Sequence, residues 1–298
     1  MVLENKQELK PDTPQTKPPL FIVGPPRCGS TYLYQLLINV FGFSYLSNLH
    51  CYFYGAPWIV EKYLSALIYN HEIEYKSNHG LTEGLAGPSE CAEYWYRFFP
   101  RKSHAVSAQF KDDKAAENFC RSLNLLATYS KTSILFKNLY NSFRIDAIRE
   151  ARPDARFIIL YRNPVDIGHS ILNQRLKQNG NYNRWWSVPV PGINRIQSMP
   201  PEKQVLEQIS AIYNAIDQSK QNVNNQYFHP IKFAHILTKP EETLLKLKQF
   251  IDNFNIEFTF NKSYIPTPQS LTRKVNINHK IYEALQVKSL DYNLKGYD

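Results

Sequence analysis

A glycine-rich segment near the start of the chain carries residue types and a spacing that suit phosphate chemistry. Gly24 is followed after four residues by Gly29, and the hydroxyl pair Ser30 and Thr31 comes next. A Walker A loop has the pattern G-x-x-x-x-G-K-[S/T], whose lysine contacts the nucleotide phosphates. Here Ser30 stands at the lysine position, and a cation, Arg27, lies inside the loop. The pattern predicts an anion-binding loop without an obligatory metal; the alternative is a purely structural strand-to-helix turn.

A second cation follows another apolar run. Arg162 comes directly after the apolar residues 155–161, and Ser170 follows eight positions later. In a helix, Asn163, Ile167 and Ser170 share one face, so an anion held between Arg162 and Ser170 would lie beside the first two turns. The alternative is a surface arginine and a solvated serine. Two anion sites at the carboxyl edge of one sheet indicate a nucleotide phosphorylated at two separated positions.

Short apolar runs followed by amphipathic segments predict the elements that position these groups. The predicted strands cover 20–23, 133–136, 155–161 and 231–236. The predicted helices run for about 11 residues from Ser30, from the cap Asn163 to about Leu176, and over 241–254 after a capping box at 238–241. This alternation favours an α/β fold with a central parallel sheet flanked by helices.

Two segments fall outside the alternation. Residues 1–18 are polar with three prolines, and we expect a disordered lead-in there. Residues 179–201 contain two tryptophans among prolines and glycines, which predicts a long irregular insertion, a kind of loop that is usually either functional or disordered. Residues 19–298, with this insertion included, are expected to form a single domain.

The composition limits the classes of partner. With 35 Lys and Arg against 26 Asp and Glu, the net charge of +9 favours anionic ligands, but no basic run is dense enough to predict nucleic-acid binding. The four cysteines form no C-x-x-C pair, so we expect no zinc site. The sequence contains no apolar run of about 18 residues, so we expect no membrane span. Without a signal-peptide pattern, we expect a reducing, cytoplasmic location.

Two quoted segments together resemble the signature segments of sulfotransferases that use 3′-phosphoadenosine 5′-phosphosulfate (PAPS). VGPPRCGSTYLYQLL (23–37) resembles the family's 5′-phosphosulfate loop, often P-R-S-G-T-T-L, and RPDARFIILYRNPVDIGHSIL (152–172) resembles its 3′-phosphate segment, strand-R-[D/N]-P-x₆-S. FAHILTKPEETLLKLKQFIDNF (233–254) is similar to a third family segment, but Ala234 and His235 replace its Glu-Asp. The resemblance spans about 19–260 and implies a P-loop NTPase-like sulfotransferase fold.

The resemblance also implies a donor site. The 5′-phosphosulfate would be held by the loop residues Pro26, Arg27, Cys28, Gly29, Ser30, Thr31 and Tyr32. Arg162 and Ser170 would hold the 3′-phosphate, and Arg273 with Lys274 matches a C-terminal Arg-Lys segment, although Val275 replaces the glycine that follows. Lys137 matches a family lysine and would act with Arg27 on the transferred group or the bridging oxygen; its alternative is a surface lysine. The product would be adenosine 3′,5′-bisphosphate (PAP), with no metal required.

A hydroxyl acceptor also needs a general base, usually Glu or His. Some relatives carry a Glu about 21 residues after the loop arginine; here that region holds Asn48, which cannot act as a base, and His50. Glu90, at the start of a predicted aromatic-rich helix, is our first candidate and His50 the second, with His79 and Glu93 as further options. Each has a structural alternative, such as a helix N-terminal acid for Glu90.

We therefore expect transfer of a sulfuryl group from PAPS to a hydroxyl or amine acceptor, such as a carbohydrate or glycolipid. One alternative is an ATP-dependent P-loop phosphotransferase, which needs the lysine that Ser30 replaces. Another is a non-catalytic relative that binds a nucleotide or glycan. The aromatic content of 14% fits either an acceptor pocket or core packing. The sequence does not decide between a monomer and a homodimer.

Overall fold

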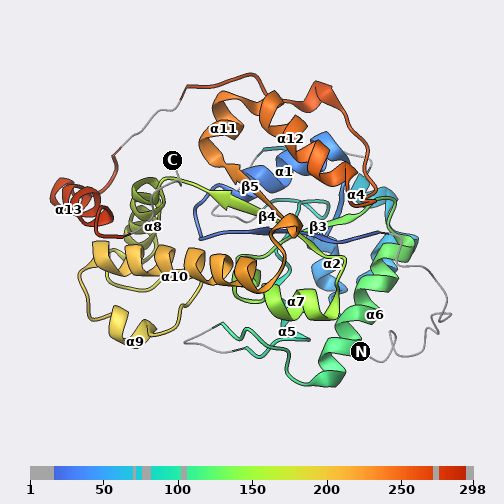
Figure 1. Cartoon of the computed structure of the whole chain (residues 1–298), viewed down its shortest axis with the longest axis horizontal. Coiled ribbons are helices and arrows are strands. Elements are labelled where there is room, and N and C mark those ends of the chain that lie inside the picture. Colours follow the sequence, from blue (N-terminus) through green and yellow to red (C-terminus); the bar gives the residue numbers. More distant parts are fainter. Residues whose placement is uncertain (1–16, 70–71, 76–81, 102–105, 271–274, 293–298) are drawn as a thin grey trace.

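The computed structural model describes residues 17–69, 72–75, 82–101, 106–270 and 275–292. Five parallel strands form one sheet in the order β2-β3-β1-β4-β5 (Figure 1). The strands are β1 (Leu20–Val23), β2 (Ser44–Tyr45), β3 (Ile134–Lys137), β4 (Arg156–Tyr161) and β5 (Phe228–Lys232). The central parallel sheet predicted from the sequence is confirmed.

The middle of the sheet is apolar because helices cover both of its faces. Every residue of β1 is buried. Phe21 of β1 stacks on Phe136 of β3 and on Phe157 of β4, with ring centroids 5.2 and 5.3 Å apart. The same three residues are paired in the strand register. This row of rings aligns the three central strands, so their carboxyl ends meet at one edge of the sheet.

Helices lie on both sides of the sheet, with α1, α11 and α12 on one side and α6, α7 and α10 on the other (Figure 1). The longer helices are α1 (Ser30–Phe41), α6 (Asp113–Tyr129), α8 (Pro164–Asn179), α10 (Pro201–Asn222), α12 (Pro240–Asp252) and α13 (His279–Ser289). The shorter ones are α2 (Asn48–Tyr52), α3 (Trp58–Tyr63), α4 (Ala66–Tyr69), α5 (Ala92–Tyr96), α7 (Ile145–Ala151), α9 (Ile193–Ile196) and α11 (Phe233–Thr238), with 3₁₀ turns η2 (Leu139–Phe143), η3 (Asn225–Tyr227) and η4 (Lys262–Tyr264).

Two predicted helix starts are confirmed. Helix α1 begins at Ser30, as the apolar periodicity predicts. Helix α8 begins at Pro164, and the side-chain oxygen of Asn163 accepts hydrogen bonds from the N–H groups of Val165 and Asp166. The cap satisfies two donors that the first turn leaves without partners.

The predicted strand over 231–236 is wrong. Strand β5 ends at Lys232, and Phe233–Thr238 forms helix α11. The strand instead begins earlier and includes the exposed Pro230. A proline has no N–H to donate to a neighbouring strand, and β5 tolerates it because this strand is at the edge of the sheet and has a neighbour on one side only. The predicted capping box is also wrong, because the Thr238 hydroxyl donates to the Ala234 carbonyl and α12 begins without a side-chain cap.

The segment 179–201 is irregular apart from α9 and packs against helix α10. The amide of Gln208 donates to the carbonyls of Trp186 and Val188, at 3.1 and 2.7 Å. Val188 and Val190 are buried. The side-chain amide and two apolar anchors hold this segment in one conformation beside the sheet's carboxyl edge.

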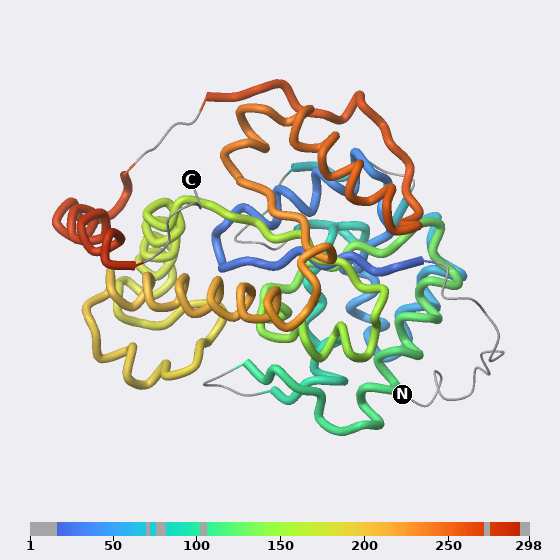
Figure 2. The backbone as a smooth tube through the Cα atoms, in the orientation of Figure 1, coloured from blue at the N-terminus to red at the C-terminus, as the bar shows by residue number. Residues whose placement is uncertain are grey.

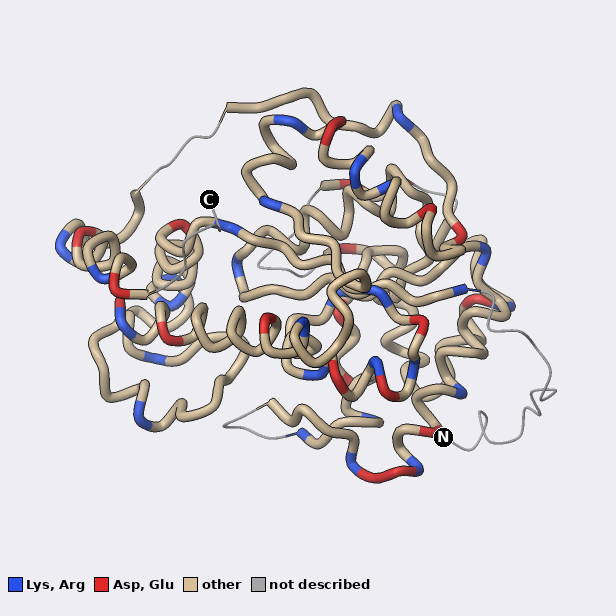
Figure 3. Tube along the Cα trace, viewed as in Figure 1, with Lys and Arg blue, Asp and Glu red and all other residues tan. Residues whose placement is uncertain are grey.

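The ends of the described chain lie on the outside of the fold. Residues 1–16 of the predicted lead-in are outside the described residues, but Lys17 donates to the Ser130 carbonyl at 2.6 Å. Helix α13 lies beside α8, where Leu285 packs close to Gly168 (Figure 2). Lys and Arg are distributed along most elements among Asp and Glu (Figure 3). Among the described residues, no helix has the length and apolar character that crossing a bilayer requires.

Candidate active site

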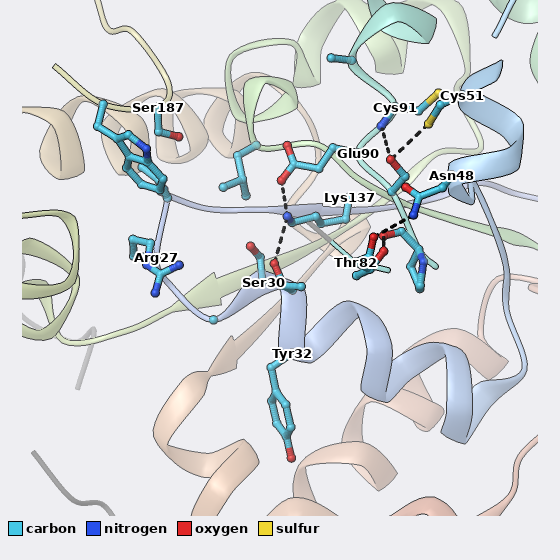
Figure 4. Close-up of a pocket in the computed structure, with 18 of the residues that line it drawn as sticks. Arg27, Ser30, Tyr32, Asn48, Cys51, Thr82, Glu90, Cys91, Lys137 and Ser187 are labelled. Atoms are coloured by element: carbon cyan, nitrogen blue, oxygen red, sulfur yellow. Dashed lines mark hydrogen bonds and ion pairs between the residues drawn. The ribbon is translucent and has the colours of Figure 1, made fainter. Parts of the chain in front are cut away.

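A cavity of about 550 Å³ opens at the carboxyl edge of the sheet, beyond the ends of β1, β3 and β4 (Figure 4). One wall, which we call the donor wall, consists of Pro26, Arg27, Gly29, Ser30, Thr31, Tyr32, Lys137 and Arg162. The opposite acceptor wall consists of Asn48, Cys51, Thr82 and 88–93. Trp186 and Ser187 from the irregular insertion, together with Leu139, complete the lining. Most of the predicted donor residues therefore meet in one place.

The loop between β1 and α1 is held in a fixed shape. The N–H of Gly24 donates to the Ser142 hydroxyl at 3.0 Å, and that hydroxyl lies 3.2 Å from the Gly24 carbonyl. Gly29 has φ +100°, and a Cβ there would lie 2.2 Å from the Phe233 ring. Arg27 has φ +67°, a conformation that costs energy for a residue with a side chain. The loop leads into the N-terminus of α1, where backbone N–H groups favour an anion.

Lys137 stands at the junction of the two walls. It is the last residue of β3, and its side chain is 3% exposed. Its ammonium donates to the Thr31 hydroxyl at 3.2 Å and forms an ion pair with the Glu90 carboxylate (Figure 4). A buried cation needs such partners to offset the loss of hydration. Two of the four predicted catalytic residues are thus in direct contact, beside a hydroxyl of the anion loop.

Glu90 lies in the turn before α5 rather than in the helix. Its carbonyl accepts hydrogen bonds from the indole of Trp95 at 3.0 Å and from the amide of Asn138 at 3.2 Å. The next residue, Cys91, has φ +44° and precedes the first residue of α5. The carboxylate is 35% exposed and faces the cavity, so solvent and a ligand can both reach it.

The two predicted anion segments contact each other through their arginines. The Arg27 guanidinium donates to the Ser170 hydroxyl at 2.9 Å, and the Arg162 guanidinium donates to the Arg27 carbonyl at 2.9 Å. Burial, and then the nearby positive charge of Arg162, lower the pKa of Arg27. A bound anion would oppose both effects, so the pair is electrostatically suited to a negatively charged ligand.

The acceptor wall is tied together by small polar groups. The Asn48 amide donates to the carbonyls of Thr82 and Gly84, both at 2.8 Å. The Cys51 thiol donates to the Ser89 hydroxyl at 3.2 Å. The hydrogen bond with Cys91 lowers the pKa of Cys51 and raises the pKa of Cys91, so Cys51 is the more acidic thiol of the pair.

His50 does not reach the cavity. Its side chain is fully buried, with Nδ1 at 2.8 Å from the Ser47 hydroxyl and Nε2 at 3.1 Å from a Glu61 oxygen. It closes a capping box at the start of α2, so its position gives no support to the prediction that it is a base. Glu93 does line the cavity, where it pairs with Arg101. His79 lies outside the described residues.

The remaining predicted donor residues differ in their placement. Tyr32 lines the cavity, whereas Cys28 is buried behind the loop, where burial raises the pKa of its thiol to about 11. Arg273 and Lys274 lie outside the described residues. No group of three or more His, Cys, Asp or Glu is arranged to hold a metal within the described ranges.

Sequence reasoning missed several residues that shape the site. Ser142 fixes the anion loop, Asn138 holds Glu90, and Phe233 packs against Gly29. Ser142 and Asn138 belong to no motif, and although Phe233 begins the third family-like segment, nothing in that segment marks its contact with Gly29, because each of the three acts between distant parts of the chain. Trp186 had a signal, since the composition of 179–201 predicted a long irregular insertion that was either functional or disordered.

Comparisons with known proteins identify the family of the chain. A family model described as the sulfotransferase family matches residues 18–254. The omega-hydroxy-beta-dihydromenaquinone-9 sulfotransferases Stf3 of Mycobacterium bovis and of Mycobacterium tuberculosis are each 21% identical over 258 residues, covering 78% of this chain. The match spans 62% of the length of these relatives.

A solved structure shows the same fold. The crystal structure of sulfotransferase STF9 from Mycobacterium avium matches with a TM-score of 0.56 and 15% sequence identity. The match covers 94% of this chain and 77% of that one. With a family model that spans most of the sequence and a sulfotransferase architecture, the chain belongs to the sulfotransferase family.

Proposed function

We propose that the protein transfers a sulfuryl group from PAPS to a hydroxyl acceptor. The observation that carries the proposal is the position of the Lys137 ammonium between Thr31 of the anion loop and the Glu90 carboxylate. In-line group transfer needs a cation where charge develops on the leaving oxygen and a base beside the acceptor. Lys137 and Glu90 supply both, within one cavity.

The donor wall suits a nucleotide with two anionic groups. In this proposal Arg27, Ser30 and Thr31 bind the 5′-phosphosulfate, with the backbone of the Gly29 turn, and Arg162 with Ser170 binds the 3′-phosphate. The burial of Arg27 and its proximity to Arg162 support this assignment, because both make an anion favourable there. Pro26, Cys28 and Tyr32 shape the loop, and Arg273 is proposed from the family resemblance alone.

The reaction then balances as a single displacement. The acceptor oxygen forms a bond to sulfur while the bond between sulfur and the 5′-phosphate oxygen breaks. Glu90 takes the acceptor proton, and Lys137 with Arg27 stabilises the negative charge on the leaving oxygen. The products are a sulfate ester and PAP. Donor binding would draw Lys137 toward the phosphosulfate and free a Glu90 oxygen for the acceptor. The proposed chemistry requires no metal.

For the acceptor, we propose an alcohol with an apolar or glycosidic body. The relatives named above are sulfotransferases of an omega-hydroxylated dihydromenaquinone, which supports a hydroxyl on a lipid-like molecule. Tyr52, Phe53 and Tyr54 directly follow Cys51 of the acceptor wall and are exposed, with Tyr52 at 77%. Exposed aromatic rings can cover a lipid tail or stack on a sugar. An acceptor screen should therefore compare glycans, glycolipids and apolar alcohols.

Calorimetric titration with PAP and with ATP, each with and without Mg²⁺, tests the nucleotide class. We expect PAP to bind without metal and to lose affinity in Arg162→Ala. ATP binding that needs Mg²⁺, without PAP binding, would favour the phosphotransferase alternative. PAP binding without turnover of any hydroxyl acceptor would favour a non-catalytic relative. Cell fractionation and size-exclusion chromatography test the proposed cytoplasmic location and homodimer.

A further inference from the structure

Phe233 lies behind the two anion-binding segments and contacts both of them. It is the first residue of α11, directly after the end of β5. The Arg162 guanidinium carbon lies 4.8 Å from the centroid of its ring, and the Tyr32 ring meets it edge-on at 6.4 Å. The ring also occupies the space that a Cβ on Gly29 would need. One side chain therefore connects the loop after β1 with the arginine after β4.

The geometry indicates that Phe233 acts through Arg162. The ring is partly buried and is not among the residues that line the cavity, so its contacts are with the residues that do. The Arg162 guanidinium lies over the ring and also donates to the Arg27 carbonyl. A guanidinium over an aromatic face is held by a cation–π contact that uses none of its N–H donors, so the contact itself leaves them available to a phosphate.

We propose that Phe233 is a positioning residue that makes the site selective for nucleotides carrying both a 5′ and a 3′ anionic group. It holds Arg162 at a fixed separation from the loop at Gly29, so that both groups of one ligand are bound together. This inference rests on the proposed function, because it assigns Arg162 to the 3′-phosphate.

The test compares PAP with adenosine 5′-monophosphate, which lacks the 3′-phosphate, by calorimetric titration of the full chain. Phe233→Leu keeps apolar volume near Gly29 but removes the aromatic face. We expect the variant to bind PAP about tenfold more weakly while its affinity for the monophosphate changes by less than about twofold. Phe233→Tyr, which keeps the ring, should retain the PAP affinity of the original protein.

Phe254→Leu is a matched control, because Phe254 also lies against a guanidinium, with Arg156 Cζ at 4.0 Å from its ring centroid. Neither residue lines the cavity, so this variant should leave PAP affinity unchanged. A double-mutant cycle with Arg162→Ala isolates the coupling. If the ring acts through Arg162, adding Phe233→Leu to Arg162→Ala should cause no further loss of PAP affinity.

Equal losses of PAP and monophosphate affinity, or additive losses in the cycle, would overturn the inference and leave Phe233 as packing for the loop. Phe233→Met serves in the same cycle if the leucine variant does not fold. Failure of the original protein to bind PAP would instead contradict the proposed function. If the original protein binds PAP and Phe233→Leu keeps the same ratio of PAP affinity to monophosphate affinity, the positioning role is overturned and the proposed function is not.

Discussion

The donor and acceptor walls of the cavity are built from different kinds of structure. The donor wall follows directly from the ends of β1, β3 and β4, and two hydrogen bonds between Gly24 and the Ser142 hydroxyl fix its loop. The residues of the acceptor wall come from the short helix α2, from the turns between Thr82 and Cys91 and from the start of α5, and the Asn48 amide joins α2 to the turn at Thr82 and Gly84. Segments outside the sheet can change without disturbing the core. Under the proposed function, the sheet edge would therefore position the donor, whereas the segments outside the sheet would select the acceptor.

One contact crosses between the walls, the ion pair of Lys137 and Glu90. Its donor-side member is buried at the end of a strand, whereas its acceptor-side member is partly exposed in a turn. The largest expected effects therefore come from changing these two residues, and smaller ones from residues within a single wall.

We expect Lys137→Ala to lower kcat/KM for sulfuryl transfer by about 10²- to 10³-fold, because the charge on the leaving oxygen loses its nearest cation. PAP titration should still show binding through Arg27 and Arg162. Lys131 is an exposed lysine just before β3, and the matched control Lys131→Ala should keep full activity. Full activity in Lys137→Ala would remove the proposed role of this lysine.

Glu90→Gln should lower kcat by about 10²-fold, since the amide cannot take the acceptor proton. The same change at Glu93, three residues later and paired with Arg101 at the surface, should have little effect on kcat. Steady-state kinetics with one acceptor would compare the two variants. A larger loss in Glu93→Gln than in Glu90→Gln would identify Glu93 as the base. If both variants kept the activity of the original protein, neither residue would be the base.

Substitutions at two glycines, one beside each wall, test how rigid the two walls are. Gly29→Ala would place a Cβ 2.2 Å from the Phe233 ring, so we expect a loss of about 3 kcal/mol in the free energy of unfolding and weaker PAP binding. Gly84 has φ +76° but open space around it, and Gly84→Ala should cost only about 1 kcal/mol. Denaturant unfolding and PAP titration measure both. Equal losses in the two variants would contradict a rigid donor wall beside a tolerant acceptor wall.

Two cysteines should differ in their reactivity toward iodoacetamide at pH 8. The hydrogen bond with Cys91 lowers the pKa of Cys51, whereas burial raises the pKa of Cys28 to about 11. Because the thiolate is the nucleophile, Cys51 should be alkylated at least about tenfold faster. Peptide mass spectrometry over time would measure this. Modification should block acceptor turnover but leave PAP binding intact; loss of PAP binding would contradict the separation of the walls.

The parts of the site predicted from the sequence are those in which neighbouring residues act together. The β1 loop, the start of α1 and the Asn163 cap depend on residues within one segment, and all three lie where predicted. Lys137 and Glu90 were predicted separately, on residues 47 positions apart, and only the fold pairs them. His50 shows the opposite case, because its partner Glu61 keeps it in the core.

The predicted strand at 231–236 was wrong for a related reason. Its apolar residues fit a strand or a short helix equally well, and local pattern cannot decide between them. In the fold, β5 pairs with β4 up to Lys232, which lies opposite the last residue of β4, and α11 begins at the next residue, Phe233. Because α11 begins at Phe233, the aromatic ring of this residue lies beneath the Arg162 guanidinium.

By itself, the sequence determined the class of fold and the positions of two strand–loop–helix segments, for which anion binding stays a prediction, because apolar periodicity and strand–loop–helix motifs depend on short-range order. Only the tertiary structure decided which carboxylate meets Lys137, that His50 is buried, and that Phe233 contacts both anion segments. These relations join residues far apart in the chain. Parallel strand pairing and core packing bring them together, and neither leaves a local pattern in the sequence.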